Sequence, residues 1–390
     1  MSRAPAAKSV STMIKHAIAD GPEPLLRTLQ VGLTATLIIL GVCGASVWPA
    51  RAQAALKRDR TRGHSTTFLR FLDAPELGRP LDAVPKLSVS FGGAVHRAVM
   101  DTGSTGILVS ADMIPAWTSL PSLGPAELTY SSSGRVMQGQ WVVTPVTIAG
   151  ADGAAVSTRP MPVLAVTRIT CLANARDCKP EEAPRHVSML GVGFARQGDH
   201  QAQSTPDRNP LLQLPAMTAG KLRRGYIVTR HGVHVGLGRG DTRSDFVTVP
   251  LAHSQEFDDW AAPPVCISVA GHSPPACGTV LMDTGVARSF LTVPPAQLAG
   301  ATAAAANGEP ILVSSTSIGL QLNRPGAPPW GYSFVVDDAA NPVAPRGVTL
   351  VRPGQRPTFF NTSFHFLNGF DYLYDAEQGL VGYRRRPLLP

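Results

Sequence analysis

Charged residues, aromatic residues, cysteines and helical periodicity are all scarce in this sequence. Only 16% of its 390 residues are charged, 6% are aromatic, and five are cysteines. Few segments keep a helical spacing of apolar residues for long, and the short candidates are 217–225 and 294–306. No phosphate-binding loop or dinucleotide fingerprint occurs, so nucleotide-dependent chemistry is not expected and no cofactor is predicted.

Positive charge is spread along the chain rather than concentrated. The formal net charge is +8, but part of it precedes the first apolar segment and most of the rest is scattered, apart from residues 384–386. The basic residues ahead of the apolar segment are Arg3, Lys8, Lys15 and Arg27. No basic stripe alternates with aromatic residues, so the sequence argues against nucleic-acid binding.

One long apolar run is present, over residues 29–48, and it carries no charge. Small residues separated by one position follow it at 50–52 and 52–54, as at signal cleavage sites, which predicts a signal peptide over 1–54. The alternative is an uncleaved membrane anchor, since the run is just long enough to span a bilayer. In both versions the rest of the chain is exported, to the periplasm or the medium, either free or tethered through 29–48.

Cysteine spacing also fits export. Cys43 belongs to the apolar run, and the remaining four form two close pairs, Cys171 with Cys178 and Cys266 with Cys277. In an oxidising compartment such pairs predict two small disulfide loops. A zinc site is the alternative, but it would need ligands converging from distant places, and neither spacing is CxxC. No metal is therefore expected.

Glycine and proline are plentiful, at 37 and 35 residues, which suits many short elements joined by turns. After an irregular leader over 55–80, apolar residues alternate with polar ones over 87–91, a Gly-Gly turn follows, and a second strand runs into Asp101. Residues 266–282 repeat the arrangement and run into Asp283. The sequence predicts a mainly β chain with one long internal duplication.

The duplication carries one acidic turn twice, as AVMDTGS at 98–104 and VLMDTGV at 280–286. A single Asp-Thr-Gly triplet is most simply a solvated turn, but each copy here follows an apolar strand at a matching place. Two carboxyl groups brought face to face cannot both ionise easily, so they share a proton and serve as acid and base on one water. The glycines would allow close approach, and the threonine hydroxyls could cross-link the two turns.

Five segments in this order resemble the pepsin-like aspartic protease family, and the resemblance extends over nearly everything after residue 80. They are 127–150 (the flap hairpin), 187–195 (the strand behind the first turn, with Met189, Leu190 and Gly191), 223–251 (strands crossing between lobes), 266–285 (the approach to the second aspartate) and 370–384 (the closing strands). The resemblance implies an all-β, bilobal double-barrel fold with the active-site cleft between lobes at about 60–238 and 239–388. It further implies a monomer, since both half-sites lie in one chain.

The function implied by the resemblance is that of an exported, bacterial-type aspartic endopeptidase acting on polypeptide. Asp101 and Asp283 would be catalytic, and Tyr130 would be the flap tyrosine that contacts substrate. The residues expected to support the pair are Thr102, Gly103, Ser104, Thr284 and Gly285.

Some positions depart from the family pattern. Val286 and Ala287 stand where hydroxyl residues are usual, so we expect Asp283 to lack a donor, to hold the shared proton, and to make the pH optimum less acidic than that of pepsin. Asn361 stands where the second-lobe glycine is expected, and asparagine tolerates unusual backbone angles. These departures leave a second function open, a catalytically weakened binding protein for peptides or cell-envelope polymers.

The flap region departs as well. Leu108 replaces a tryptophan that normally hydrogen-bonds the flap tyrosine, and Trp141 is the candidate substitute.

Overall fold

The computed structural model describes residues 66–176, 178–199, 201–238, 241, 245–324, 326–351 and 357–387. The predicted signal peptide or anchor (1–54), the tether within it (29–48) and the leader up to residue 65 lie outside the described residues. Within the described ranges, no helix is both long and apolar enough to cross a membrane.

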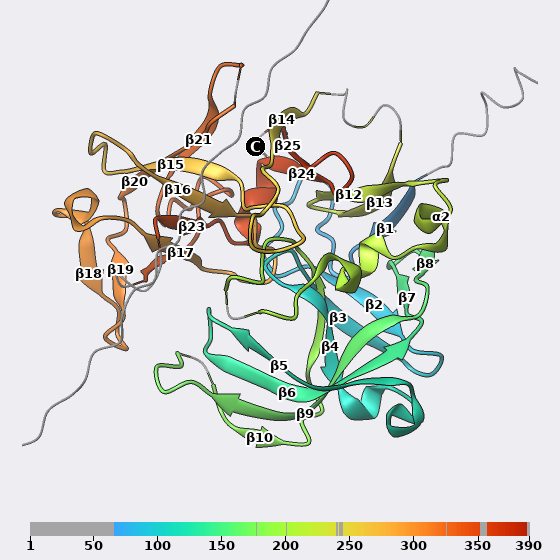
Figure 1. Ribbon diagram of the computed structural model, residues 1–390. Helices are drawn as coiled ribbons and strands as arrows, with labels where there is room; N and C mark the ends of the chain where they lie inside the picture. Colours follow the sequence, from blue (N-terminus) through green and yellow to red (C-terminus); the bar gives the residue numbers. More distant parts are fainter. Residues whose placement is uncertain are drawn as a thin grey trace, which may run out of the picture. The chain divides into compact units, whose positions relative to one another are not determined.

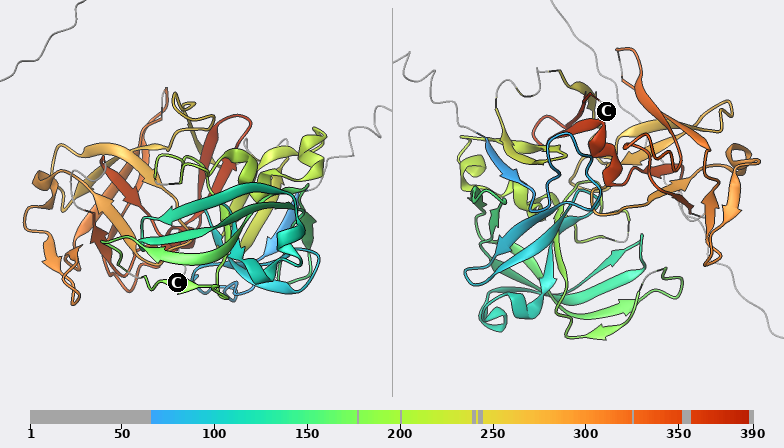
Figure 2. Two further views of the ribbon diagram at one scale, coloured as in Figure 1. Left: turned by 60° about the horizontal axis from the view of Figure 1, so that its bottom comes forward. Right: turned by 180° about the vertical axis from the view of Figure 1, so that it is seen from behind.

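The described residues form three β-sheets joined by turns, and helix is confined to single turns (Figures 1 and 2). The first sheet has the order β5-β6-β9-β4-β11-β3-β2-β7-β8, with β10 paired to β9. Its strands are β2 (Lys86–Ser90), β3 (Val95–Asp101), β4 (Thr105–Ser110), β5 (Ser122–Tyr130), β6 (Arg135–Thr144), β7 (Thr147–Ala149), β8 (Ala155–Ser157), β9 (Met161–Cys171), β10 (Glu181–Glu182) and β11 (Ser188–Val192).

The second sheet, yellow to red in Figure 1, has the order β18-β19-β22-β17-β23-β16-β15-β20-β21. Its strands are β15 (Pro264–Val269), β16 (Ala276–Leu281), β17 (Ser289–Thr292), β18 (Thr302–Ala304), β19 (Pro310–Leu312), β20 (Ser317–Leu322), β21 (Trp330–Val335), β22 (Val348–Leu350) and β23 (Phe359–Asn361).

The third sheet draws its strands from both halves of the chain, in the order β1-β13-β12-β24-β25-β14. They are β1 (Thr67–Arg70), β12 (Arg223–Thr229), β13 (Gly232–Leu237), β14 (Val247–Pro250), β24 (Phe370–Asp375) and β25 (Leu380–Arg385). Pairing of β12 with β24 joins the chain before residue 238 to the chain near its end. The predicted lobe limits, 60–238 and 239–388, stay a prediction.

The two predicted short helices are only single turns. Helix α2 covers Pro215–Thr218, and 294–306 contains the 3-10 turn η6 (Pro295–Leu298) followed by a strand. The other 3-10 turns are η1 (Ala111–Met113), η2 (Trp117–Ser119), η3 (Pro206–Arg208), η4 (Pro210–Leu212) and η7 (Phe364–Asn368). Proline in the first turn favours the start of each helix. Neither segment has the amphipathic pattern that would stabilise a longer helix by packing.

Both predicted hairpins form, because alternating apolar residues turn one face of each into the core. The burial of β2 alternates along its length, and so does that of β15. In each hairpin the second strand leads into an acidic turn: β3 ends at Asp101, and β16 ends two residues before Asp283. The internal duplication read from the sequence is therefore present in the strands that hold the turns.

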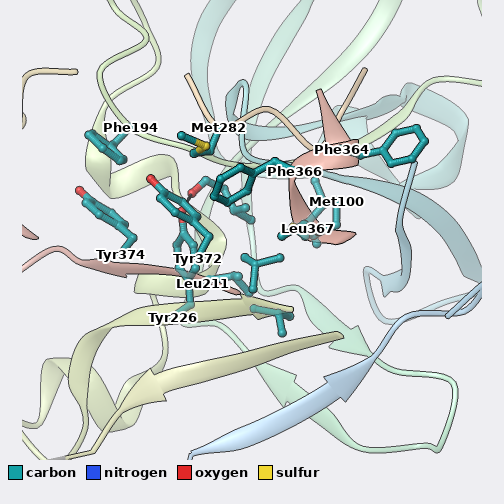
Figure 3. Packing of buried hydrophobic residues seen from close by; sticks show 14 of the residues in the cluster. Met100, Phe194, Leu211, Tyr226, Met282, Phe364, Phe366, Leu367, Tyr372 and Tyr374 are labelled. Atoms are coloured by element: carbon teal, nitrogen blue, oxygen red, sulfur yellow. Dashed lines mark hydrogen bonds between the residues drawn. The ribbon is translucent and has the colours of Figure 1, made fainter. Parts of the chain in front are cut away.

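Aromatic and apolar side chains from both halves of the chain pack together in one buried cluster (Figure 3). Met100 and Met282, the residues immediately before the two aspartates, belong to one buried cluster. Phe194 stacks on Tyr374 with ring centroids 4.2 Å apart. The Tyr226 hydroxyl donates to the carbonyl of Val192 at 2.5 Å. This packing fixes the backbone of the residues that lead into the two acidic turns.

Asn368 connects distant parts of this fold through three hydrogen bonds to backbone. Its Oδ1 accepts from Leu81 N at 2.7 Å, and its Nδ2 donates to the carbonyls of Leu81 and Pro342 at 3.0 and 2.9 Å. Because the side chain is only 1% exposed, its loss leaves buried backbone groups without partners.

We expect Asn368→Ala to lower the free energy of unfolding by about 2–5 kcal/mol. Denaturant unfolding measures the change. Asn307→Ala, at an exposed position, is the control and should cost about 0.5 kcal/mol or less. Equal losses in the two variants would contradict a structural role for Asn368.

Candidate active site

The two aspartates lie face to face, each against the glycine of the opposite turn. A Cβ atom added to Gly103 would lie 2.3 Å from Cγ of Asp283, and one added to Gly285 would lie 2.4 Å from Oδ1 of Asp101. Asp101 and Asp283 are 3% and 6% exposed. Only glycine leaves room for this approach, so both Asp-Thr-Gly turns are needed to form one site.

Threonine side chains join the two turns, as the sequence predicts. Thr102 Oγ1 donates to Met282 O at 2.5 Å and accepts from Thr284 N at 3.1 Å. Thr284 Oγ1 donates to Met100 O at 2.6 Å, and it accepts from Thr102 N at 3.0 Å. The arrangement is reciprocal, so the position of each turn is set by the other.

Each carboxyl group accepts two hydrogen bonds. Asp101 accepts from Gly103 N at 2.6 Å and from Ser104 Oγ at 2.5 Å. Asp283 accepts from Gly285 N at 2.9 Å and from Asn361 Nδ2 at 2.5 Å. The expectation that Asp283 lacks a donor because of Val286 is therefore wrong, since Asn361 supplies the bond from a different strand.

The pKa of Asp283 is raised well above the usual carboxyl range. Burial is the main cause, and the neighbouring charge of Asp101 adds to it. Hydrogen bonds from Asn361 and Gly285 and the charge of Arg196 offset part of this rise in pKa. The direction agrees with the sequence prediction for Asp283, but the cause is burial and like charge rather than a missing donor.

Asn361 is also not the counterpart of the first-half glycine. Gly191 pairs with Asp101 itself in the parallel ladder of β11 and β3, whereas Asn361 pairs with Leu281, two residues before the second aspartate. The ladder between β16 and β23 ends at Asn361, so among the described residues none pairs with Asp283 as Gly191 pairs with Asp101. The assignment of Asn361 to the glycine position is therefore wrong.

A cavity of about 510 Å³ contains both aspartates and is bordered by the hairpin of β5 and β6. Tyr130, at the end of β5, lines it, and its buried hydroxyl lies near Ser104 and Asp101. Burial and the charge of Asp101 raise the pKa of this phenol. Trp141 donates to Gln203 Oε1 at 2.6 Å, so the expectation that it substitutes as the partner of Tyr130 is wrong.

The tip of this hairpin is held by the loop that the first disulfide closes, residues 171–178. Arg176 donates to the carbonyls of Ser131 and Ser132 at 3.1 and 3.4 Å. The same guanidinium lies 3.0 Å from a carboxylate oxygen of Glu309, which belongs to the segment between β18 and β19. Arg176 thus links the hairpin tip to the second half of the chain.

Both predicted disulfides are present, Cys171–Cys178 and Cys266–Cys277, so the alternative of a zinc site built from these cysteines is wrong. Within the described part of the chain, no three His, Cys, Asp or Glu side chains gather as a metal site.

Sequence reasoning missed four charged residues of the cavity, namely Arg135, Arg176, Arg196 and Asp199. Arg196 is 7% exposed, forms an ion pair with Asp199, and lies near enough to Asp283 to lower its pKa. Asp199 also accepts a hydrogen bond from the hydroxyl of Ser131 at the hairpin tip. No motif surrounds Arg196 in the sequence, because its proximity to the aspartates is created only by the fold.

Comparison with known proteins identifies the fold. No family model matches the sequence, and no curated protein matches it. Among solved structures, the chain is similar to the crystal structure of aspartic proteinase from Irpex lacteus, with a TM-score of 0.51 and 15% sequence identity over 83% of this chain and 98% of that chain. The all-β fold is thus that of a pepsin-like aspartic proteinase.

We expect the threonine bridge to contribute to stability. Thr102→Val keeps the shape of the side chain but leaves Met282 O and Thr284 N without this partner, and should cost about 2–4 kcal/mol. Thr102→Ser keeps the hydroxyl and should retain most of that stability. Thermal and denaturant unfolding of the two variants make the comparison, and equal losses would contradict the role of the hydroxyl.

Proposed function

We propose that the protein is an aspartic endopeptidase in which Asp101 and Asp283 activate one water molecule. The observation that supports this most directly is that each carboxyl group lies against the glycine of the opposite turn, within one cavity. Two buried carboxyl groups that raise each other's pKa cannot both ionise easily, so the pair holds one proton between them. That state is the one required for acid and base catalysis on a shared water.

In the proposed mechanism Asp283 holds the proton and Asp101 is charged. Asp101 takes a proton from the water as the water oxygen bonds to the carbonyl carbon of the scissile peptide. Asp283 gives its proton to the carbonyl oxygen, which forms a tetrahedral intermediate. The intermediate collapses as its C–N bond breaks: one of its two hydroxyl groups returns a proton to Asp283, and the leaving nitrogen takes the proton held by Asp101, which gives a carboxylic acid and an amine and restores the starting state of the pair.

The substrate is proposed to be extended polypeptide cut between apolar residues. Apolar side chains from both halves of the chain line the cavity, namely Met137, Met189, Leu281, Phe290, Val351 and Phe359. Tyr130 would cover the bound peptide from the hairpin. Its buried hydroxyl, near the two aspartates, offers a donor for a peptide carbonyl.

The remaining features are proposed on more general grounds. Two disulfides favour an oxidising compartment outside the cytoplasm. Because one chain carries both aspartates, the site needs no second copy, and the protein is proposed to act as a monomer with lobes at about 60–238 and 239–388.

Substitution of either aspartate tests the proposal. Asp101→Asn and Asp283→Asn should each lower turnover of denatured casein by at least about 1,000-fold, since acid–base help is typically worth 10²–10⁴-fold per group. Asp82→Asn, at an exposed position outside the cavity, should behave as wild type. Binding of casein without turnover in the wild type would instead favour the peptide-binding alternative.

The pH profile gives a second test. The raised pKa of Asp283 keeps the shared proton in place at a pH where an ordinary carboxyl, with a pKa of about 4, has lost it. Activity should therefore persist to about pH 6 and fall as the pH rises through the pKa of Asp283. Initial rates between about pH 2 and pH 9 measure this, and a loss of activity complete by about pH 5 would contradict it.

A further inference from the structure

The internal duplication gives each aspartate two neighbouring positions from which a side chain can reach it. One position is the third residue after the aspartate, Ser104 in the first half and Val286 in the second. The other lies on the adjacent parallel strand. On that strand Met189 pairs with Val99, two residues before Asp101. Asn361 pairs with Leu281, two residues before Asp283. Met189 and Asn361 are therefore equivalent.

In each half one of these two positions is polar and the other apolar, and the choice is reversed between the halves. Ser104 Oγ donates to Oδ2 of Asp101 at 2.5 Å, and Asn361 Nδ2 donates to Oδ2 of Asp283 at 2.5 Å. The same carboxylate oxygen thus receives a bond of the same length, once from the turn and once from the strand.

Asn361 is itself held in place by the chain. Its side chain is only 4% exposed, and its Oδ1 accepts a hydrogen bond from Ser363 N at 3.0 Å. Because that oxygen is engaged by an N–H donor, the amide nitrogen is the atom that faces Asp283. The bond to the carboxyl group is thus directed rather than incidental.

We propose that Asn361 is a positioning residue for Asp283. From the strand it does for Asp283 what Ser104 does for Asp101 from the turn. This rests on the proposed function, since it concerns the same carboxyl pair. A primary amide donates a hydrogen bond without adding charge, so it orients the carboxyl group and leaves the shared proton in place. The charged or titratable groups that face Asp283 are Asp101, Arg196 and Tyr130, and Asn361 acts alongside them.

The chain itself supplies the test, because the arrangement of the first half can be copied into the second. Asn361→Met removes the donor and reproduces Met189. The double variant Val286→Ser, Asn361→Met then adds the equivalent of Ser104 and should return the donor to the turn. Asn361→Asp keeps the shape and the acceptor for Ser363 N but replaces the donor with a charge.

With casein as substrate, Asn361→Met should lower kcat by about tenfold or more and change KM far less, because the lost hydrogen bond is strongest when Asp283 gives up its proton and becomes charged in the transition state. The alkaline limb of its pH profile should move to higher pH, since the amide lowers the pKa of Asp283. Asn361→Asp should move it further, and the double variant should move it back. The proposal would be overturned if the alkaline limb of the pH profile stayed in place in both single variants. It would also be overturned if a folded double variant did not restore the wild-type position of that limb.

A measurement without turnover separates this proposal from the proposed function. The folded-state pKa of Asp283 lies above its unfolded value, so its contribution to stability falls as the pH rises between the two values. Removal of the amide extends that fall to higher pH. The difference in Tm between wild type and Asn361→Met should therefore stay constant from about pH 4 up to the wild-type pKa of Asp283, about 8, and widen only above it, and the double variant should narrow it.

If the wild type lacks peptidase activity, the proposed function fails while the Tm comparison still decides the role of Asn361. A Tm difference that is the same at every pH would mean that Asn361 is only structural, and would overturn the positioning role.

Discussion

The approach of each buried aspartate to the glycine of the opposite turn is the constraint on which the structure depends. Burial and like charge both oppose ionisation, and these effects raise the pKa of Asp283. Four donors oppose that cost, two from turn amides and two from the side chains of Ser104 and Asn361. The glycines at 103 and 285 allow the approach, so each turn is incomplete without its partner.

Holding that contact requires order well beyond the two turns. The threonine bridge ties Thr102 and Thr284 to the backbone that precedes each opposite aspartate. Below it, Met100 and Met282 enter a common apolar cluster, and the third sheet joins strands from both halves. The site therefore shares its rigidity with the core, because a shift in either half would separate the carboxyl groups.

The two halves meet the same requirement with different residues. In the second half, Asn361 has the strand position that Met189 has in the first, and Ser363 just after it adopts a φ of 59°. Asn361 contributes twice there, since its Oδ1 holds the N–H of Ser363 while its Nδ2 reaches Asp283. Val286 and Asn361 each depart from the family pattern in a way that suggests lost activity. The two departures compensate each other, because Asn361 supplies the side-chain donor that Val286 cannot.

The sequence by itself determined the β class, the hairpins that lead into Asp101 and Asp283, and the cysteine pairs. These features depend on local periodicity, turn chemistry and short spacings, which a sequence displays directly. Only the tertiary structure decided the donor of Asp283, the register of β23, the partner of Trp141 and the place of Arg196. Those features depend on which atoms meet across strands distant in sequence. A shift of two residues in one strand keeps the same face buried and leaves the apolar pattern unchanged, while it changes which side chain reaches the carboxyl group.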